Sequence, residues 1–99
     1  TGSWILLGSE NSMSASFAST AHGAGRMMSR SKARRDFTES EVKKSLNDKG
    51  IFIKSLTRDG VVEETPQAYK DVDAVVNVSH NLGIATKVAK LVPIGVIKG

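Results

Sequence analysis

The sequence contains no cysteine, so it offers neither a disulfide bond nor a thiolate metal site. Aromatic residues make up only 5% of its 99 residues, and a chain of this length buries a small share of its surface, so we expect one small domain with a modest core. No apolar run approaches the roughly 18 residues that a membrane-spanning helix needs. With no signal peptide recognisable either, we expect an intracellular, cytoplasmic protein without a membrane partner.

Metal-ligating residues are also scarce. The only two histidines, His22 and His80, lack the H-x-x-H or H-x-x-x-H spacing of a metal site, so the sequence predicts no metal ligands of its own. His80 lies late in a valine-rich segment, where a lone histidine is interpreted as a surface or helix-cap residue. The paired acidic residues are interpreted as helix N-terminal charges that suit the helix dipole: Glu63, Glu64, Asp71 and Asp73.

Positive charge exceeds negative charge, with 14 Lys and Arg against 10 Asp and Glu and a net charge of +4. Residues 26–35 hold five of the positive charges before the next acidic residue, Asp36. A basic balance of this kind favours a nucleic-acid partner, although a mild excess is also ordinary for a soluble domain. The composition therefore permits RNA binding without requiring it.

One stretch, residues 19–26 with the sequence STAHGAGR, has a pattern typical of phosphate chemistry. Gly23 and Gly25 lack a Cβ, so the backbone can approach a ligand and direct its N–H groups at an anion. Arg26 adds a charge suited to phosphate oxygens, and His22 can act as a nucleophile or as an acid/base. The alternative is a plain glycine turn that leads into a helix, with His22 at its edge.

The first third of the chain predicts three elements. The continuous apolar run within residues 2–8 predicts a strand buried on both faces. A short helix is expected from residue 9 or 10, with Met13 and Phe17 on its inner face. A further helix is expected to begin near Arg26 and to place Arg26, Arg30 and Arg34 on one face. That face is either a solvated basic surface or a stripe that follows RNA phosphates.

The remaining sequence predicts mixed helices and strands. Thr38 and Glu41 form a capping box for a helix that ends near Gly50, with Val42 and Leu46 inward. A strand follows from residue 51, and Asp59-Gly60 predicts a hairpin turn into a return strand at residues 61–62. Thr65-Pro66 predicts another helix start. A helix is then expected over residues 71–82, followed by Gly83, and its inward positions are Val72, Val75, Val76 and Leu82. One or two strands are expected within residues 84–97. This order is typical of the α+β class.

Lys98 is the penultimate residue, and chain ends usually fray. The preceding residues 94–97, Ile-Gly-Val-Ile, are apolar enough to hold the end of the chain against a core. A lysine fixed in this way can reach a ligand.

Four blocks of the sequence resemble the RtcB family of RNA ligases, and they occur in the family's order. They are Gly2-Ser3 with the strand after it, STAHGAGRMMSR at residues 19–30, EETPQAYKDVD at residues 63–73, and PIGVIKG at residues 93–99. The resemblance runs the length of the chain. It implies that residues 1–99 are one segment, the C-terminal portion of a larger RtcB-type ligase domain whose metal-binding part lies upstream.

The resemblance implies a GTP- and Mn²⁺-dependent ligase that joins RNA 3′-phosphate or 2′,3′-cyclic phosphate ends to 5′-hydroxyl ends through a histidine–GMP intermediate, as in tRNA splicing and RNA repair. His22 matches the guanylylated histidine. The residues matching nucleotide contacts are Ser3, His22, Gly23, Ala24, Gly25 and Lys98, and those expected near RNA phosphate are Arg26 and Arg30. The manganese ligands lie upstream, so we expect no metal site here and no activity from residues 1–99 alone.

The sequence also permits two other interpretations. The chain can be a non-catalytic, basic module that binds nucleotide or RNA, or a structural fragment that functions only when it is reassembled with its missing part.

Overall fold

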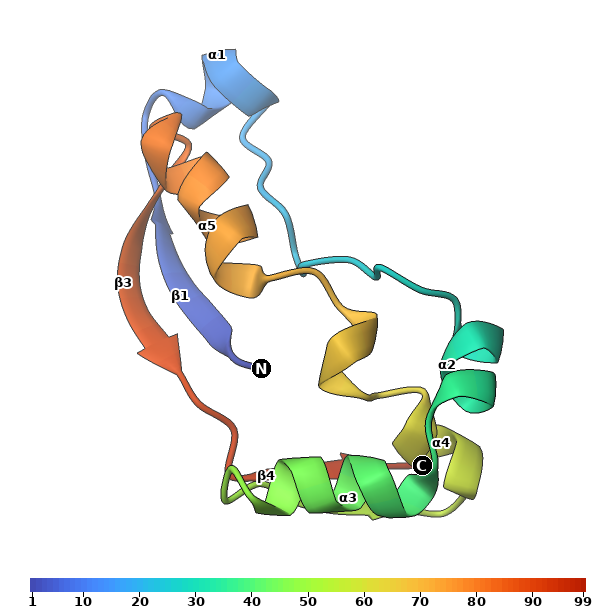
Figure 1. The fold of residues 1–99 in the computed structure, drawn as a ribbon. Coiled ribbons are helices and arrows are strands. Elements are labelled where there is room, and N and C mark those ends of the chain that lie inside the picture. The colour runs from blue at the N-terminus through green and yellow to red at the C-terminus, as the bar shows by residue number, and fades with distance from the viewer. The chain divides into compact units, whose positions relative to one another are not determined.

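The computed structural model describes residues 1–99 and divides them into two compact units. Unit 1 comprises residues 1–25 and 70–92, and unit 2 comprises residues 26–69 and 93–99. Each unit combines helices with a pair of strands, which confirms the α+β class (Figure 1). None of the helices has the length and hydrophobicity needed to span a bilayer.

Unit 1 is built on an antiparallel pair of strands. Its elements are β1 (Ser3–Gly8), α1 (Ser12–Ser16), α5 (Val72–Asn81) and β3 (Ala85–Leu91). Strand β1 pairs with β3 from Ser3 opposite Leu91 to Gly8 opposite Ala85, with an irregularity between Ile5 and Leu6. Helix α5 packs against this pair, as Figure 1 shows.

The strand predicted at residues 2–8 is present, but the prediction that both of its faces are buried is wrong for this chain. Trp4 and Leu6 are half-buried, whereas Ile5 is 48% and Leu7 66% exposed. Successive side chains of a strand point to opposite faces. Because β1 and β3 form a sheet of only two strands, the face that carries Ile5 and Leu7 has no cover within unit 1.

Helix α1 is shorter than expected and has no buried residue. The prediction that Met13 and Phe17 pack inward is wrong, because both side chains are exposed. Phe17 ends the helix in the left-handed conformation with φ 53°, and Ala18 continues with φ 57°. A helix of five residues has too little length to build an inner face of its own.

Unit 2 contains most of the well-buried core. Its elements are α2 (Arg30–Asp36), α3 (Glu39–Asn47), β2 (Phe52–Ser55), α4 (Arg58–Val62), the 3-10 helix η1 (Pro66–Ala68) and β4 (Gly95–Lys98). Strands β2 and β4 run parallel, with Phe52 opposite Gly95 and Ser55 opposite Lys98. The core cluster consists of Val42, Leu46, Ile51 and Val61, with Phe37, Ile53 and Val96 packed against it.

Helix α3 begins and ends as its sequence predicts. The Thr38 hydroxyl accepts a hydrogen bond from the Glu41 N–H, and the Glu41 carboxylate accepts one from the Thr38 N–H at 2.8 Å, which completes the capping box. At the other end Gly50 has φ 73°, and the Ile51 N–H reaches back to the Leu46 carbonyl at 2.9 Å. This is the Schellman arrangement that glycine favours.

The hairpin predicted at Asp59-Gly60 is wrong, because residues 58–62 form helix α4. The Thr57 hydroxyl accepts a hydrogen bond from the Gly60 N–H at 3.1 Å and so caps the helix. Val61 and Val62 are both buried. In a strand these neighbours would point to opposite faces, whereas the helical turn lets both enter the interior.

The later elements largely follow the prediction. Thr65-Pro66 starts only the short η1, in which the buried Thr65 hydroxyl bonds to the Gln67 side chain instead of capping the helix. Helix α5 is present and is followed by Gly83 with φ 70°, but Leu82 is exposed, contrary to the prediction. Its inner positions Val72, Val75 and Val76 are buried or half-buried, as predicted, and both C-terminal strands are present.

We predict that Leu46→Ala lowers the free energy of unfolding by about 2–5 kcal/mol, the range for a leucine deleted from a core. Leu46 is 5% exposed, whereas Leu56 in the same unit is 85% exposed. Leu56→Ala is therefore the matched control, with a change within about 0.5 kcal/mol. Urea unfolding of the 99-residue chain measures both variants, and equal losses would contradict this core assignment.

Candidate functional site

The predicted nucleophile lies in an irregular loop of unit 1. The His22 side chain is exposed, and no helix or strand includes it. Before it, the Thr20 and Ser79 hydroxyls are hydrogen-bonded at 2.8 Å, which ties the loop to α5. After it, the Gly25 carbonyl accepts a hydrogen bond from the Lys70 N–H at 3.0 Å. The loop is thus fixed on both sides of an accessible imidazole.

The glycines beside His22 leave the backbone open, as the motif predicts. A Cβ added at Gly23 or Gly25 would meet no atom within 4 Å. Gly25 has φ 75°, a conformation that other residues adopt only with strain. Ala24 between them is half-buried. A ligand can therefore approach the main chain here.

Ser3 is the first residue of β1, and its side chain is exposed. The strand is tied to α5 by its neighbour Trp4, whose indole N–H donates to Asp73 Oδ1 at 2.8 Å. The Lys90 ammonium donates to Asp73 Oδ2 at 2.6 Å. Hydrogen bonds from Lys90 and then Trp4 hold the pKa of Asp73 below its usual range. The Asp73 carboxylate thus links Trp4, the residue next to Ser3, to Lys90 and helps to hold this end of β1 in place.

Arg26 does not begin a helix, contrary to the prediction. The helix starts at Arg30, with Ser29 as its cap accepting a hydrogen bond from the Lys32 N–H at 3.1 Å. Arg26 instead forms an isolated antiparallel bridge with Tyr69, and the Met27 N–H donates to a carbonyl of η1 at 2.8 Å. The three arginines therefore do not form one helical stripe.

The Arg26 side chain is engaged by its own unit. Its Nε donates to the Met28 carbonyl at 3.0 Å, Nη1 to the Tyr69 hydroxyl at 3.1 Å and Nη2 to the Glu63 carbonyl at 2.9 Å. The guanidinium carbon also lies 4.8 Å from the centre of the Tyr69 ring, within the range of a cation–π contact. Arg26 thus holds residues 63–69 in place, and only its remaining N–H groups are left for a phosphate.

Arg30 and Arg34 both pair with Glu63. Arg30 Nε lies 3.4 Å from Glu63 Oε2, and Arg34 Nη1 hydrogen-bonds to Glu63 Oε1. Glu63 is the C-cap of α4, so its interpretation as a helix N-terminal charge is wrong, whereas Asp71 does cap α5 as predicted. Because Arg30 is 64% exposed, it keeps a surface that RNA can reach.

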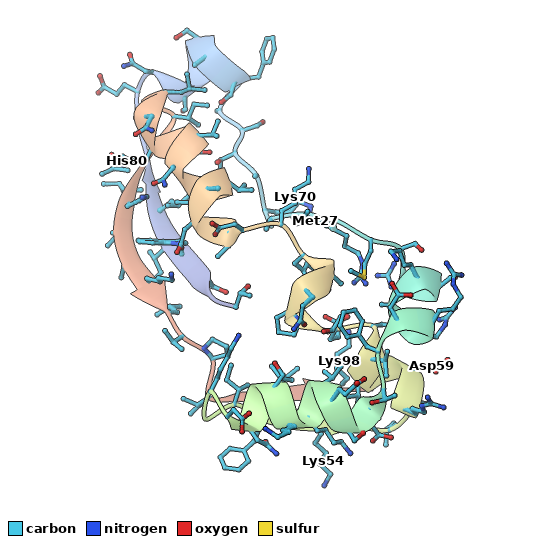
Figure 2. The ribbon with its side chains drawn as sticks, in the orientation of Figure 1. Met27, Lys54, Asp59, Lys70, His80 and Lys98 are labelled. Atoms are coloured by element: carbon cyan, nitrogen blue, oxygen red, sulfur yellow. The ribbon has the colours of Figure 1, made fainter.

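A hollow of about 460 Å³ lies beside these arginines in unit 2. It is lined by one continuous segment, Arg26 to Ser31, and includes Met27, which Figure 2 labels. The floor combines two arginines with two methionines, so it offers both charge and an apolar surface.

Lys98 ends strand β4, so the prediction that this end of the chain is held in place is confirmed, but not by the apolar run as a whole. Only Val96 packs against the core, whereas Ile94 and Ile97 are exposed, and the pairing of β4 with β2 holds the strand. Its ammonium lies 3.1 Å from Glu64 Oε1, and the Tyr69 hydroxyl donates to Glu64 Oε2 at 2.8 Å. Figure 2 shows Lys98 and Lys54 projecting from opposite sides of the β2–β4 pair. The Lys98 side chain is 39% exposed and that of Glu64 24%, so the ion pair is only partly shielded from solvent.

The charges in this cluster keep Glu64 ionised. Burial raises the pKa of Glu64, but hydrogen bonds from Tyr69 and Lys98, with the charges of Lys98 and Arg26, outweigh burial and lower this pKa below its usual value. Burial, followed by the hydrogen bond and charge of Glu64, raises the pKa of Tyr69. At neutral pH the Glu64 carboxylate is therefore ionised and accepts hydrogen bonds from the Tyr69 hydroxyl and the Lys98 ammonium.

The residues of this chain do not fit a metal site by themselves, since the structure brings together no group of three His, Cys, Asp or Glu side chains. Nδ1 of His80 (labelled in Figure 2) accepts a hydrogen bond from the Lys87 N–H at 3.2 Å, a structural role in agreement with its interpretation.

Comparison with known proteins identifies one family. Residues 1–99 match the family model described as tRNA-splicing ligase RtcB. The chain is 52% identical to a tRNA-splicing ligase RtcB of Nanoarchaeum equitans and 46% identical to one of Methanococcus maripaludis, in each case over all 99 residues and 21% of the relative. An RNA-splicing ligase RtcB of Mycobacterium tuberculosis is 46% identical over the whole chain and 22% of its own length. The chain thus spans about a fifth of the length of each of these three relatives.

We predict that Arg26→Lys lowers the free energy of unfolding by about 2 kcal/mol, because a lysine cannot reproduce hydrogen bonds from charged donors that are worth about 1.5–3 kcal/mol each. Arg35→Lys is the control, because Arg35 lies exposed on α2 of the same unit. Thermal unfolding measures both variants. If the two substitutions destabilise equally, the structural role of Arg26 is wrong.

Proposed function

The chain belongs to the RtcB family, and from this membership we propose that it forms the C-terminal part of a GTP- and Mn²⁺-dependent RNA ligase, the part that carries the nucleophile. The names of the relatives support the ligase chemistry. The observation that carries the residue assignment is the exposed His22 in a fixed, glycine-lined loop.

In the proposed reaction an imidazole nitrogen of His22 attacks the α-phosphorus of GTP. A nitrogen–phosphorus bond forms, the bond to the β-phosphate oxygen breaks, and pyrophosphate leaves with the electron pair. The guanylate then passes from His22 to an RNA 3′-phosphate. The 5′-hydroxyl of a second RNA end displaces GMP and seals the strand, after prior hydrolysis where the first end is a 2′,3′-cyclic phosphate. Histidine suits this sequence because its phosphoramidate is labile enough to pass the group on.

Other residues are proposed to hold the nucleotide and the RNA. Backbone N–H groups of residues 23–25 and the Ser3 hydroxyl face the nucleotide, with the open main chain at Gly23 and Gly25 in support. Lys98 contacts the guanylate, and its fixed strand supports this role. Arg26 and Arg30 contact RNA phosphate, and the exposure of Arg30 supports its assignment. The substrates are proposed to be tRNA halves or broken RNA ends.

The Mn²⁺ dependence is proposed from the family alone. The side chains of residues 1–99 do not assemble a metal site, so the ligands would lie in the rest of the ligase chain. This division predicts that the 99-residue chain has no ligase activity of its own.

The rest of the ligase chain is the proposed cover for the open face of β1. The apolar run in β1 is typical of a strand buried on both faces, yet Ile5 and Leu7 are exposed in unit 1. The relatives are about five times longer than this chain, so they contain ample sequence to provide that cover. We therefore propose that the face with Ile5 and Leu7 packs against the remaining part of the ligase.

A second candidate function is a non-catalytic module that binds nucleotide or RNA. The exposed Arg30 and the net charge of +4 favour it. The two functions differ in their need for His22. A binding module keeps its affinity when His22 becomes alanine, whereas the ligase loses the covalent guanylate altogether.

We predict a covalent GMP adduct on His22 after incubation with GTP and Mn²⁺ when the rest of the ligase is supplied as a separate chain, and no adduct on residues 1–99 alone. Intact-mass spectrometry under denaturing conditions, followed by peptide mapping, detects the adduct. His22→Ala is the control and should carry none. An adduct on the isolated chain would refute the division of the site, and no adduct in an assembled complex would favour the binding module.

We also predict that Leu7→Asp weakens assembly with the separately expressed remainder by about tenfold or more, since a charge buried without a partner is strongly unfavourable. Leu82→Asp is the matched control, because Leu82 also belongs to unit 1 and is 63% exposed, against 66% for Leu7. Titration calorimetry measures both affinities. Wild-type affinity for Leu7→Asp would show that this face is not the contact surface.

A further inference from the structure

We propose that Glu64 is a positioning residue that holds the Lys98 ammonium in place for the nucleotide. This inference rests on the proposed function, in which Lys98 contacts the guanylate. From its sequence context Glu64 is expected only to be a helix N-terminal charge. The contacts that indicate its further role all lie within unit 2.

Glu64 has one oxygen for each of two donors. Oε1 lies 3.1 Å from Lys98 Nζ, and Oε2 accepts from the Tyr69 hydroxyl at 2.8 Å. A lysine side chain has four rotatable bonds and loses considerable entropy when its head group is held at one point. The Tyr69 hydroxyl fixes the carboxylate, and the fixed carboxylate in turn restricts the ammonium.

The support extends one step further, to Arg26. Its guanidinium donates to the Tyr69 hydroxyl at 3.1 Å and to the carbonyl of Glu63 at 2.9 Å, so it holds the residues on both sides of the Glu64 carboxylate. Lys98 itself is placed by the pairing of β4 with β2. The Lys98 side chain is thus held at both ends, with its backbone in the paired strand β4 and its ammonium at the Glu64 carboxylate.

The neighbouring Glu63 shows that this arrangement is specific to Glu64. Both residues follow α4 and both carboxylates bind cations, but Glu63 pairs with Arg30 and Arg34. Its side chain is 19% exposed, close to the 24% of Glu64. The two adjacent glutamates therefore differ in their partners far more than in their burial. Only Glu64 reaches Lys98, so the pair provides a matched comparison.

The test measures GTP-dependent guanylylation by the full-length protein as a function of GTP concentration. Glu64→Gln keeps the shape of the side chain and removes the charge. We expect it to raise the KM for GTP by about tenfold, with kcat within about twofold, because the lost contact orients a binding group. Glu63→Gln should leave the KM for GTP within about twofold of the wild-type value.

A double-mutant cycle shows whether Glu64 acts through Lys98. If it does, adding Glu64→Gln to Lys98→Gln raises the KM no further than Lys98→Gln alone. A full additional tenfold increase in the double variant would overturn the proposal, because Glu64 would then act on another group. Equal KM changes for Glu63→Gln and Glu64→Gln would overturn it as well.

Lys98→Gln alone separates failure of this inference from failure of the proposed function. If this variant raises the KM for GTP and Glu64→Gln does not, the role of Lys98 stands and that of Glu64 is wrong. If Lys98→Gln leaves the KM for GTP unchanged, the proposed roles of Lys98 and Glu64 are both wrong.

An NMR titration of the Tyr69 ring, assigned through Tyr69→Phe, gives a further readout: Glu64→Gln should move the raised pKa of Tyr69 down towards its usual value. No change in this pKa would show that the Glu64–Tyr69 contact is absent, which also overturns the proposal.

Discussion

The guanidinium of Arg26 is the contact on which the proposed chemistry of unit 2 depends. It holds two carbonyls and a phenol at once and lies over the Tyr69 ring, which fixes the connection between α4 and η1. That connection carries Glu63, which pairs with the arginines of α2, and Glu64, which receives Lys98. A lysine could neutralise the same charge, but its single head group cannot span three acceptors in different directions. The planar fork of arginine therefore links three parts of this loop through one side chain.

Local signals in the sequence predicted the elements whose ends are set by neighbouring residues. The capping box at Thr38 and the glycine at position 50 determined α3, because each satisfies backbone groups within a few residues. The hairpin at Asp59-Gly60 failed because the same two residues also suit the first turn of a helix, and burial of Val61 and Val62 decided between the two. Burial depends on distant segments, so a local pattern could not settle it. The continuous apolar run of β1 predicted more burial than these residues alone provide.

The candidate site was predictable where residue type alone carries the chemistry. Residue type marked His22 and its glycines as candidates, and the resemblance of their motif gave His22 its role, which stays a prediction; the structure leaves the main chain beside it open. The links between side chains were not predictable. Glu64 and Lys98 are far apart in the sequence, and only the pairing of β4 with β2 brings them to 3.1 Å. The signal that the sequence did contain was an acid and a tyrosine on either side of Thr65-Pro66, a turn that can bring them together.

The parallel pairing of β2 with β4 also means that unit 2 lacks its second strand until residues 95–98 have been synthesised. Unit 2 is interrupted in the sequence by residues 70–92 of unit 1, so its second strand is synthesised after the helix and strand that complete unit 1. Closing a long connection costs chain entropy, and the β1–β3 pairing of unit 1 closes an even longer connection than the β2–β4 pairing does, so both units depend on strands synthesised late in the chain. A polypeptide released or cleaved before β4 would retain the histidine loop but lack the lysine. Translation must therefore pass β4 before the histidine and the lysine are present in one molecule, which restricts the proposed chemistry to chains that have been synthesised beyond this strand.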